Sequence, residues 1–239
     1  MKDKKFFYEQ YNHIDWTQQE KTKMNSYVND YITDFIMNNE NKDTVSIFDI
    51  GFGIGFFIKT FVEKAKHKYK SIFIEGCEPS NSYHHFIKGK KVEANIITHF
   101  LPFLDVDTES KFDFITAIYV LPHIQFNELE SFIKKICSML NDGGRFICII
   151  TSEKSFKSPQ KNDKDLFNVV ENNNLKYEGK DYKEILHKSM LPEIGYVYDY
   201  NRDEDLYVNM FSNNNFEVEQ RKELNDGYFL HSLIIFRKK

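Results

Sequence analysis

Residues 45–57 read VSIFDIGFGIGFF, an apolar run that ends in one acid and is followed by three glycines within five residues. The whole chain of 239 residues has only 10 glycines. The run from Val45 to Ile50 is continuous, which is typical of a strand buried on both faces. Glycines after such a strand let the backbone turn tightly and approach a ligand without interference from a Cβ. The stretch therefore predicts a ligand-binding loop at the carboxyl end of a buried strand.

The chain continues beyond the glycines as alternating strands and helices. Apolar runs predict further strands at residues 71–76, 96–100, 112–120 and 145–151. Residues 141–144, Asn-Asp-Gly-Gly, predict a turn before the last of these strands. Strand–helix–strand repetition of this kind calls for a mostly parallel α/β sheet with helices on both faces.

The two flanks of this repeat have different patterns. Residues 1–44 are predicted to form an N-terminal helical lid, because apolar residues from Met24 to Ile36 recur at helical spacing. Thr17-Gln-Gln-Glu20 has the form of a capping box at the start of that helix. Residues 45–151 are then the ligand-binding core of one structural domain.

The C-terminal third is predicted to hold a cap and the end of the sheet. Residues 152–205 are polar without strong periodicity, which we interpret as an insertion over the carboxyl edge of the sheet. Residues 206–239 then supply a helix and the last two strands of the core. Two stretches compete for the sixth strand, 172–180 and 213–221. The second is favoured because residues 229–236 follow at once and can return as an antiparallel last strand.

Composition excludes several classes of protein. The net charge is −4, whereas a nucleic-acid-binding chain usually has a clear basic excess. The three cysteines lack metal-ligand spacing, so we expect reduced thiols and no metal site. No apolar run approaches the ~18 residues of a membrane span, and the start MKDKKFFYEQ leads into no apolar segment. We therefore expect a cytoplasmic protein with no membrane partner.

The spacing of the loop glycines narrows the class of ligand that the loop is expected to bind. The loop reads Asp49-Ile-Gly51-Phe-Gly53-Ile-Gly55, whereas dinucleotide-binding loops prefer G-x-G-x-x-G and P-loops need G-x-x-x-x-G-K-[ST]. It resembles instead the first motif of class I S-adenosylmethionine-dependent methyltransferases. The sequences IEGCEPS at 74–80, FDFITAIYVLPHI at 112–124 and LNDGGRFICII at 140–150 resemble later motifs of that family in the same order. The resemblance implies a Rossmann-like, seven-stranded sheet and S-adenosylmethionine as cofactor, with S-adenosylhomocysteine as product.

The same resemblance implies a set of cofactor-binding residues. They are Asp49, Gly51, Phe52, Gly53, Gly55, Glu78, Pro79, Ser80, Tyr83, Leu101 and Ile118. Glu78 follows the second strand, where a carboxylate can accept from both ribose hydroxyls; the other interpretation is a surface acid. Two roles are open for Asp49, which either holds the glycine loop or accepts from the amino group of the cofactor. Ser80 and Tyr83 either line the adenine pocket or are simply exposed.

A finer resemblance, to the histamine N-methyltransferase group, concerns the methyl acceptor. That group has E-P-S after the second strand, as at residues 78–80 here. It implies that Tyr119 and His123 face the acceptor, that Tyr11 is a wall residue and that Glu20 binds an amine. Glu20 also has the capping-box explanation given above. His123 either takes a proton near neutral pH or only bonds the backbone at a helix start.

The function predicted from the sequence is methyl transfer to a small molecule, at an amine or imidazole nitrogen or a hydroxyl. The chain is expected to act as a monomer or homodimer and to have no nucleic-acid partner. Two alternatives are a methyltransferase acting on protein or RNA and a non-catalytic protein that binds the cofactor. The acidic balance disfavours the first, and the intact glycine loop with Glu78 disfavours the second.

Overall fold

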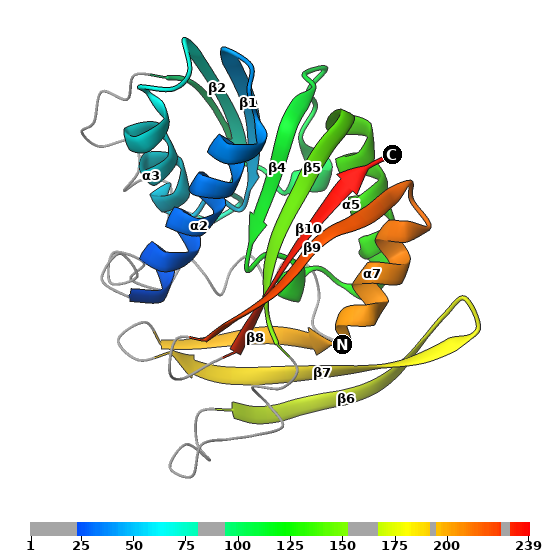
Figure 1. The fold of residues 1–239 in the computed structure, drawn as a ribbon. Coiled ribbons are helices and arrows are strands. Elements are labelled where there is room, and N and C mark those ends of the chain that lie inside the picture. The colour runs from blue at the N-terminus through cyan, green and yellow to red at the C-terminus, as the bar shows by residue number, and fades with distance from the viewer. Residues whose placement is uncertain (1–22, 81–93, 153–166, 192–194, 226–229) are drawn as a thin grey trace.

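The computed structural model describes residues 23–80, 94–152, 167–191, 195–225 and 230–239 (Figure 1). A seven-stranded sheet forms the centre of the molecule, in the order β3-β2-β1-β4-β5-β10-β9. Its strands are β1 (Thr44–Ile50), β2 (Ser71–Cys77), β3 (Asn95–His99), β4 (Phe112–Ile118), β5 (Leu140–Thr151), β9 (Phe216–Asn225) and β10 (Leu230–Lys238). The strands β1 to β5 are parallel, and β10 runs antiparallel to both of its neighbours. This is the mostly parallel sheet that the sequence predicts.

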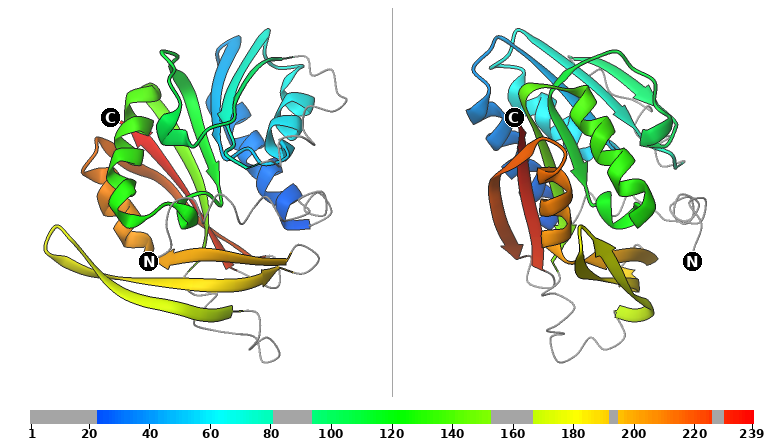
Figure 2. Two further views of the ribbon diagram at one scale, coloured as in Figure 1. Left: turned by 180° about the vertical axis from the view of Figure 1, so that it is seen from behind. Right: turned by 90° about the vertical axis from the view of Figure 1, so that its right-hand side faces the viewer.

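Helices cover both faces of this sheet (Figure 2). The helices α2 (Lys23–Asn39) and α3 (Phe56–Ala65) lie on one face, and α5 (Phe126–Met139) and α7 (Glu204–Ser212) lie on the other. The continuous apolar run of β1 serves both layers, because Ile47 packs with the α2–α3 side and Phe48 with the α5–α7 side. Helix α2, which belongs to the range predicted as a lid, buries Val28, Ile32 and Ile36 in the core.

The competition for the sixth strand is settled in favour of the second stretch. Strand β9 covers most of 213–221 and pairs with β10 inside the main sheet. Residues 172–180 instead form the end of β6 (Phe167–Tyr177), a turn and the start of β7 (Lys180–Leu191). Residues 141–144, where the sequence predicts a turn, fall within the bounds of β5 but pair with no residue of β4, and Gly143 there has a φ of 71°.

A second, antiparallel sheet has the order β6-β7-β8, with β8 spanning Gly195–Arg202. It lies across the carboxyl ends of β4 and β5 (Figures 1 and 2). The sequence predicts an insertion in this part of the chain but no strands within it. The second sheet comes close to η5 (Leu121–His123), the short 3₁₀ helix that follows β4.

A buried arginine fastens the second sheet to the first. The Arg202 side chain is fully buried, and its Nε lies 2.6 Å from Oε2 of Glu184 on β7. Its other nitrogens donate to the carbonyls of Leu121 at 3.4 Å and Ile124 at 2.8 Å. These bonds hold β8 against the turn after β4, and so keep the second sheet over the carboxyl ends of β4 and β5.

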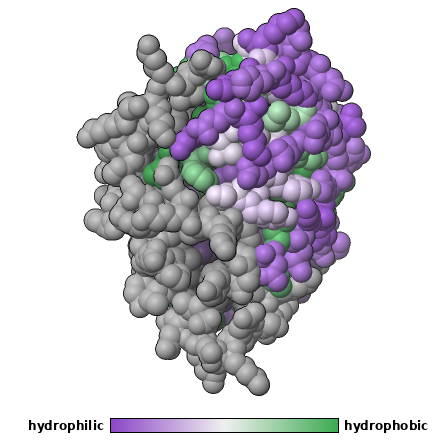
Figure 3. All heavy atoms as spheres, turned by 60° about the vertical axis from the view of Figure 1, so that its left-hand side comes forward, coloured by the Kyte–Doolittle hydropathy of each residue, from purple (hydrophilic) through white to green (hydrophobic). Residues whose placement is uncertain are grey.

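Hydrophilic residues dominate the described surface on the side shown in Figure 3. Among the described residues, no helix combines the length and the apolar character that a membrane crossing requires.

Candidate active site

The glycine loop follows β1 and is folded back on the end of β2. Gly51, Gly53 and Gly55 all have positive φ, of 67°, 53° and 75°. The amides of Gly51 and Phe52 donate to the carbonyl of Cys77, at 2.7 and 3.2 Å. The Gly55 amide donates to the Phe52 carbonyl at 2.8 Å. These three amides donate within the protein and so are not free to bind a phosphate.

Glu78 is the acid that the loop closes on. One carboxylate oxygen accepts from the Gly53 amide at 2.9 Å, and the other accepts from the Ser80 amide at 2.8 Å. The residue is buried, and burial raises the pKa of its carboxyl while the Ser80 and Gly53 donors oppose that shift. The Ser80 hydroxyl is a third donor to this carboxylate, so one of its four lone-pair positions is open to a ligand, and rotation of that hydroxyl frees a second. The Glu78 carboxylate is thus held in place at the end of β2.

Asp49 is a second acid beside the loop and is almost fully buried. Its Oδ1 accepts from the Thr116 hydroxyl on β4 at 2.7 Å. Burial raises the pKa of Asp49 to about 7, with a smaller rise from the charge of Glu78. A cation bound next to Asp49 favours its ionised form, because opposite charges stabilise each other at short range. The structure links Asp49 to β4 through Thr116, and both roles predicted for it stay open.

The turn after β4 brings Tyr119 and Val120 to the glycine loop. A Cβ on Gly51 would lie only 2.7 Å from Cγ2 of Val120, so the two segments are in direct contact. Tyr119 has a φ of 59°, which is costly for an aromatic residue and is a common property of functional sites. Its hydroxyl lies 3.1 Å from Nδ1 of His231 on β10, and its amide donates to the Ile149 carbonyl at 2.9 Å.

His123, the predicted proton acceptor, faces a residue that the sequence analysis missed. Its Nδ1 lies 3.4 Å from Oδ1 of Asp199 on β8, and the two side chains are 16% and 19% exposed. Burial lowers the pKa of His123 to about 4 and raises that of Asp199 to about 7. At neutral pH His123 is therefore uncharged. No sequence motif marks Asp199, because only the folding of the second sheet brings it to the turn after β4.

The other predicted site residues have varied positions. Ser80 is buried, Ile118 is half-buried and Leu101 is 46% exposed. The Phe52 ring packs into the core on the α2–α3 side. Within the glycine loop, only the backbone of Phe52 can therefore face a ligand. Pro79 is half-buried between Glu78 and Ser80. Tyr11, Glu20 and Tyr83 lie outside the described residues.

The site as a whole suits a ligand with hydroxyl groups and positive charge. Two buried carboxylates, Asp49 and Glu78, flank a loop whose amides are largely engaged. Within the described ranges, no group of three histidine, cysteine or acidic side chains is arranged to hold a metal ion. The arrangement can bind a cationic ribonucleoside at the sheet edge, and the turn that holds Tyr119 and His123 lies beside it through Val120.

Solved structures with this fold include methyltransferases with their cofactor bound. The magnesium protoporphyrin IX methyltransferase of Synechocystis PCC 6803 has a TM-score of 0.65 and 10% identity, over 100% of this chain and 98% of that one. The 1,6-didemethyltoxoflavin-N1-methyltransferase of Burkholderia thailandensis has a TM-score of 0.63 and 12% identity, over 99% of this chain and 87% of that one. The first structure contains S-adenosylmethionine, and the second contains its substrate and S-adenosylhomocysteine. At these identities the likeness shows the shared fold.

A model of a sequence family gives the membership. No curated protein matches the chain by sequence. The model described as "Methyltransferase domain" matches residues 22–220, which include the glycine loop, Glu78, the turn after β4 and the second sheet. The chain belongs to this methyltransferase domain family.

Proposed function

We propose that this protein transfers the methyl group of S-adenosylmethionine to a small-molecule acceptor, at a nitrogen or a hydroxyl. The observation that carries the proposal is the pair of buried carboxylates, Asp49 and Glu78, on either side of the glycine loop. Glu78 suits the two ribose hydroxyls. Asp49 suits the positively charged amino end of the cofactor. A dinucleotide would need amide donors for its phosphates, and the loop amides already have protein acceptors.

The chain's own residues supply binding and orientation. The cofactor brings an activated methyl group on a positively charged sulfur, and transfer is an in-line displacement. Most of the catalysis can therefore come from holding the acceptor lone pair opposite the leaving sulfur. Glu78 and the loop fix one side of this geometry. The turn from Tyr119 to His123 lies next to the loop through Val120, and so borders the place where the acceptor must arrive.

A small acceptor is favoured over a macromolecule for two reasons. The second sheet lies across the carboxyl ends of β4 and β5 and is fastened there by Arg202, which narrows access from that side. The net charge of −4 gives no general attraction for RNA. The Burkholderia neighbour acts on a small molecule by its name, whereas another neighbour is named a glycopeptide N-methyltransferase. The finer resemblance to histamine N-methyltransferases stays a prediction, and we do not propose histamine as the acceptor.

The test is binding followed by turnover. Calorimetry should show that the chain binds S-adenosylmethionine and S-adenosylhomocysteine at micromolar or better affinity, with no binding of NAD. Labelled S-adenosylmethionine and a panel of amines, phenols and carboxylates should then identify an acceptor. Binding of NAD but of neither adenosyl compound would overturn the assignment. Binding without turnover of any small molecule, together with labelling of protein or RNA, would favour the macromolecular alternative.

A further inference from the structure

A small cavity lies between the second sheet and the carboxyl ends of β4 and β5. It is lined by Pro122, Ile150, Thr151, Asp199, Tyr200, Asn201, Arg202 and Tyr207. Open α/β sheets bind ligands outside the carboxyl ends of their strands, which is where this cavity lies. It also lies close to the glycine loop, because Pro122 follows Val120 and Val120 touches Gly51. The cavity, of about 10 Å³, has room for one water-sized group such as an ammonium, and it borders the same turn after β4 that contacts the glycine loop.

Asp199 is the carboxylate that this cavity offers. Its side chain is 19% exposed, so a ligand can reach it. Within the described parts of the chain, the His123 imidazole is its one polar partner, at 3.4 Å between Nδ1 and Oδ1. The second carboxylate oxygen is thus available to a donor from a ligand.

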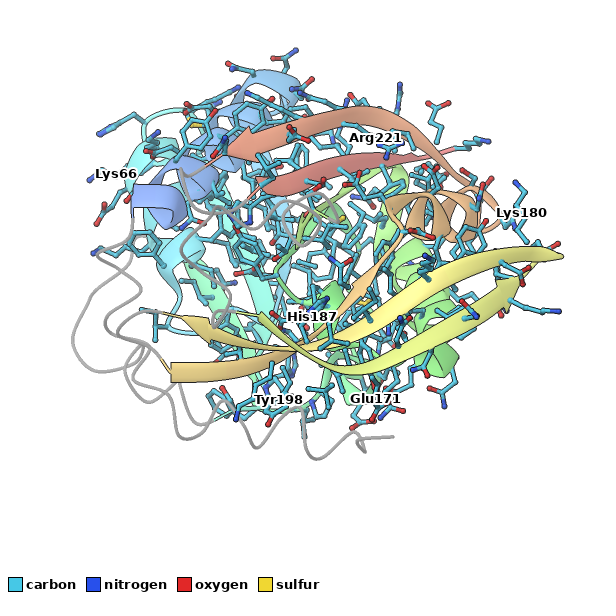
Figure 4. The ribbon with its side chains drawn as sticks, turned by 90° about the horizontal axis from the view of Figure 1, so that it is seen from below. Lys66, Glu171, Lys180, His187, Tyr198 and Arg221 are labelled. Atoms are coloured by element: carbon cyan, nitrogen blue, oxygen red, sulfur yellow. The ribbon has the colours of Figure 1, made fainter. Side chains whose placement is uncertain are left out.

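The ionisable groups around Asp199 leave its charge uncompensated. Arg202 on the same strand is ion-paired with Glu184 at 2.6 Å, and its Nη1 lies 3.3 Å from the Tyr207 hydroxyl of α7. His187 of β7 is the cross-strand neighbour of Asp199 and is buried. It shares the Asp199 face of the second sheet, whereas Tyr198 points to the opposite face (Figure 4).

We propose that Asp199 binds the nitrogen of a cationic amine acceptor and takes its proton, and that His123 positions the Asp199 carboxylate. This inference rests on the proposed function and names the substrate class for it. The sequence-based prediction gave the role of base to His123. The structure places a carboxylate at the same turn, from a strand that the sequence did not reveal.

The protonation behaviour of the pair agrees with this division of roles. Burial lowers the pKa of His123 to about 4, so the imidazole is a weak proton acceptor at neutral pH. Burial raises the pKa of Asp199 to about 7. A general base works best when its pKa lies near the operating pH. The His123 ring is itself held by hydrogen bonds to the backbone of Tyr198 and Tyr119, and its Nδ1 lies 3.4 Å from the Asp199 carboxylate, so the ring limits where that carboxylate can lie.

The step is balanced in atoms and charge. An ammonium N–H of the acceptor gives its proton to the ionised Asp199, which frees the nitrogen lone pair. That lone pair forms the new C–N bond as the C–S bond breaks, and the sulfur keeps the electron pair of the broken bond. The product leaves as a methylated ammonium ion, and the Asp199 carboxyl returns its proton to solvent.

A matched pair of probes tests the binding role. Calorimetry in saturating S-adenosylhomocysteine compares 2-phenylethylamine with 2-phenylethanol, which differ at the group that would meet Asp199. A charged hydrogen bond should make the amine bind roughly 10–100-fold more tightly to the wild type. Asp199→Asn should abolish this preference, while Asp181→Asn, an exposed acid on β7, should keep it. A wild type without preference for the amine, or an Asp199→Asn variant that keeps the preference, would overturn the proposal.

The pH profile tests the proton-transfer role. The amine identified by the turnover panel should give a rate that rises through about pH 7 in the wild type. Asp199→Asn should lose this rise and about 10²–10⁴-fold in rate. His123→Ala should keep the rise near pH 7, since burial sets the pKa of Asp199, but should lower the rate at every pH, because the carboxylate loses the ring that positions it. A rise that vanishes in His123→Ala and persists in Asp199→Asn would return the base role to His123.

The same samples separate this inference from the proposed function. If S-adenosylhomocysteine does not bind the wild type, the proposed function itself fails. If it binds and the amine preference is absent, only the assignment of Asp199 fails. The melting temperature of Asp199→Asn in each titration confirms that the variant is folded.

Discussion

The guanidinium of Arg202 donates to the carbonyl of Ile124 at 2.8 Å and so joins the last strand of the second sheet to the turn after β4. The arginine is fully buried and its charge is matched by Glu184. The second sheet is therefore held on the site by a contact that forms only when both sheets are folded. This contact also sets the distance between Asp199 and His123, since each lies three residues or fewer from a bonded group.

Removing Arg202 should loosen the second sheet without unfolding the first. Arg202→Met leaves Glu184 buried without its partner, which typically costs about 3–5 kcal/mol. Hydrogen exchange should rise in β6, β7 and β8 and remain slow in β1 to β5. The double variant Arg202→Met with Glu184→Leu removes the orphaned charge, and should recover part of the lost stability. Equal acceleration of exchange in both sheets would contradict this picture.

Glu78→Ala should weaken cofactor binding with little effect on the fold. The loss of hydrogen bonds from the ribose hydroxyls to a charged acceptor is expected to reduce affinity on the order of 10–100-fold, allowing for replacement by water. Glu109→Ala, which changes an exposed acid, is the matched control. Calorimetry with S-adenosylhomocysteine measures both variants. An unchanged dissociation constant in a folded Glu78→Ala protein would remove Glu78 from the site.

The main sheet and the position of the glycine loop in it were predictable because their signals are local. The continuous apolar run at 45–50 predicts a strand buried on both faces, and the glycines that follow it are adjacent in sequence. Glu78 follows β2, as the order of motifs predicts, and its role in binding ribose stays a prediction. These elements need only the order of motifs along the chain, which the sequence contains.

The second sheet and Asp199 were not predictable from such signals. Strands β7 and β8 bury polar side chains, among them Glu184, His187 and Arg202. A strand with buried charges has no apolar alternation, so its sequence looks like a polar insertion. Asp199 approaches His123 only when the second sheet has folded, and no periodicity in the sequence predicts that contact.

Asp49→Asn should show that pH affects the stability of the fold and the affinity for the cofactor in opposite directions. The folded-state pKa of Asp49, about 7, lies above its ordinary 3.8, so its contribution to stability is fully present below about pH 4 and is lost as pH rises through 7. An asparagine has no proton to lose. Without cofactor, the melting temperature of the variant minus that of the wild type should therefore increase from pH 5 to pH 8.

Lowering the pH should weaken cofactor binding, although it stabilises the fold. If Asp49 pairs with the cofactor's amino group, it must be ionised to do so, and the wild-type dissociation constant should rise as pH falls below about 7. The limit is about tenfold per pH unit for one proton. Asp49→Asn should bind more weakly with a flat profile between pH 6 and 8. A wild-type profile equally flat would remove the amino-group role from Asp49 and leave its bond to Thr116 on β4.

An added methyl group should destabilise the folded protein more at position 51 than at position 53. Both have positive φ, so alanine at either position is strained by roughly 1–2 kcal/mol. A Cβ at Gly53 meets no atom of the described residues within 4 Å, whereas one at Gly51 would lie 2.7 Å from Cγ2 of Val120. Overpacking of this kind typically adds about 1–3 kcal/mol. Denaturant unfolding should therefore show Gly51→Ala as clearly more destabilising than Gly53→Ala.

A double-mutant cycle assigns that difference to Val120. Val120→Ala removes the methyl group that a Cβ at position 51 would strike. The combined Gly51→Ala and Val120→Ala variant should be more stable than the sum of the two single changes predicts, by about 0.5–3 kcal/mol, the usual coupling between residues in contact. The Gly53→Ala and Val120→Ala pair is the control and should be additive, since position 53 has open space. Additivity in both pairs would show that the glycine loop and the turn after β4 are not in contact in solution, and the acceptor side of the site would then lose its link to the cofactor side.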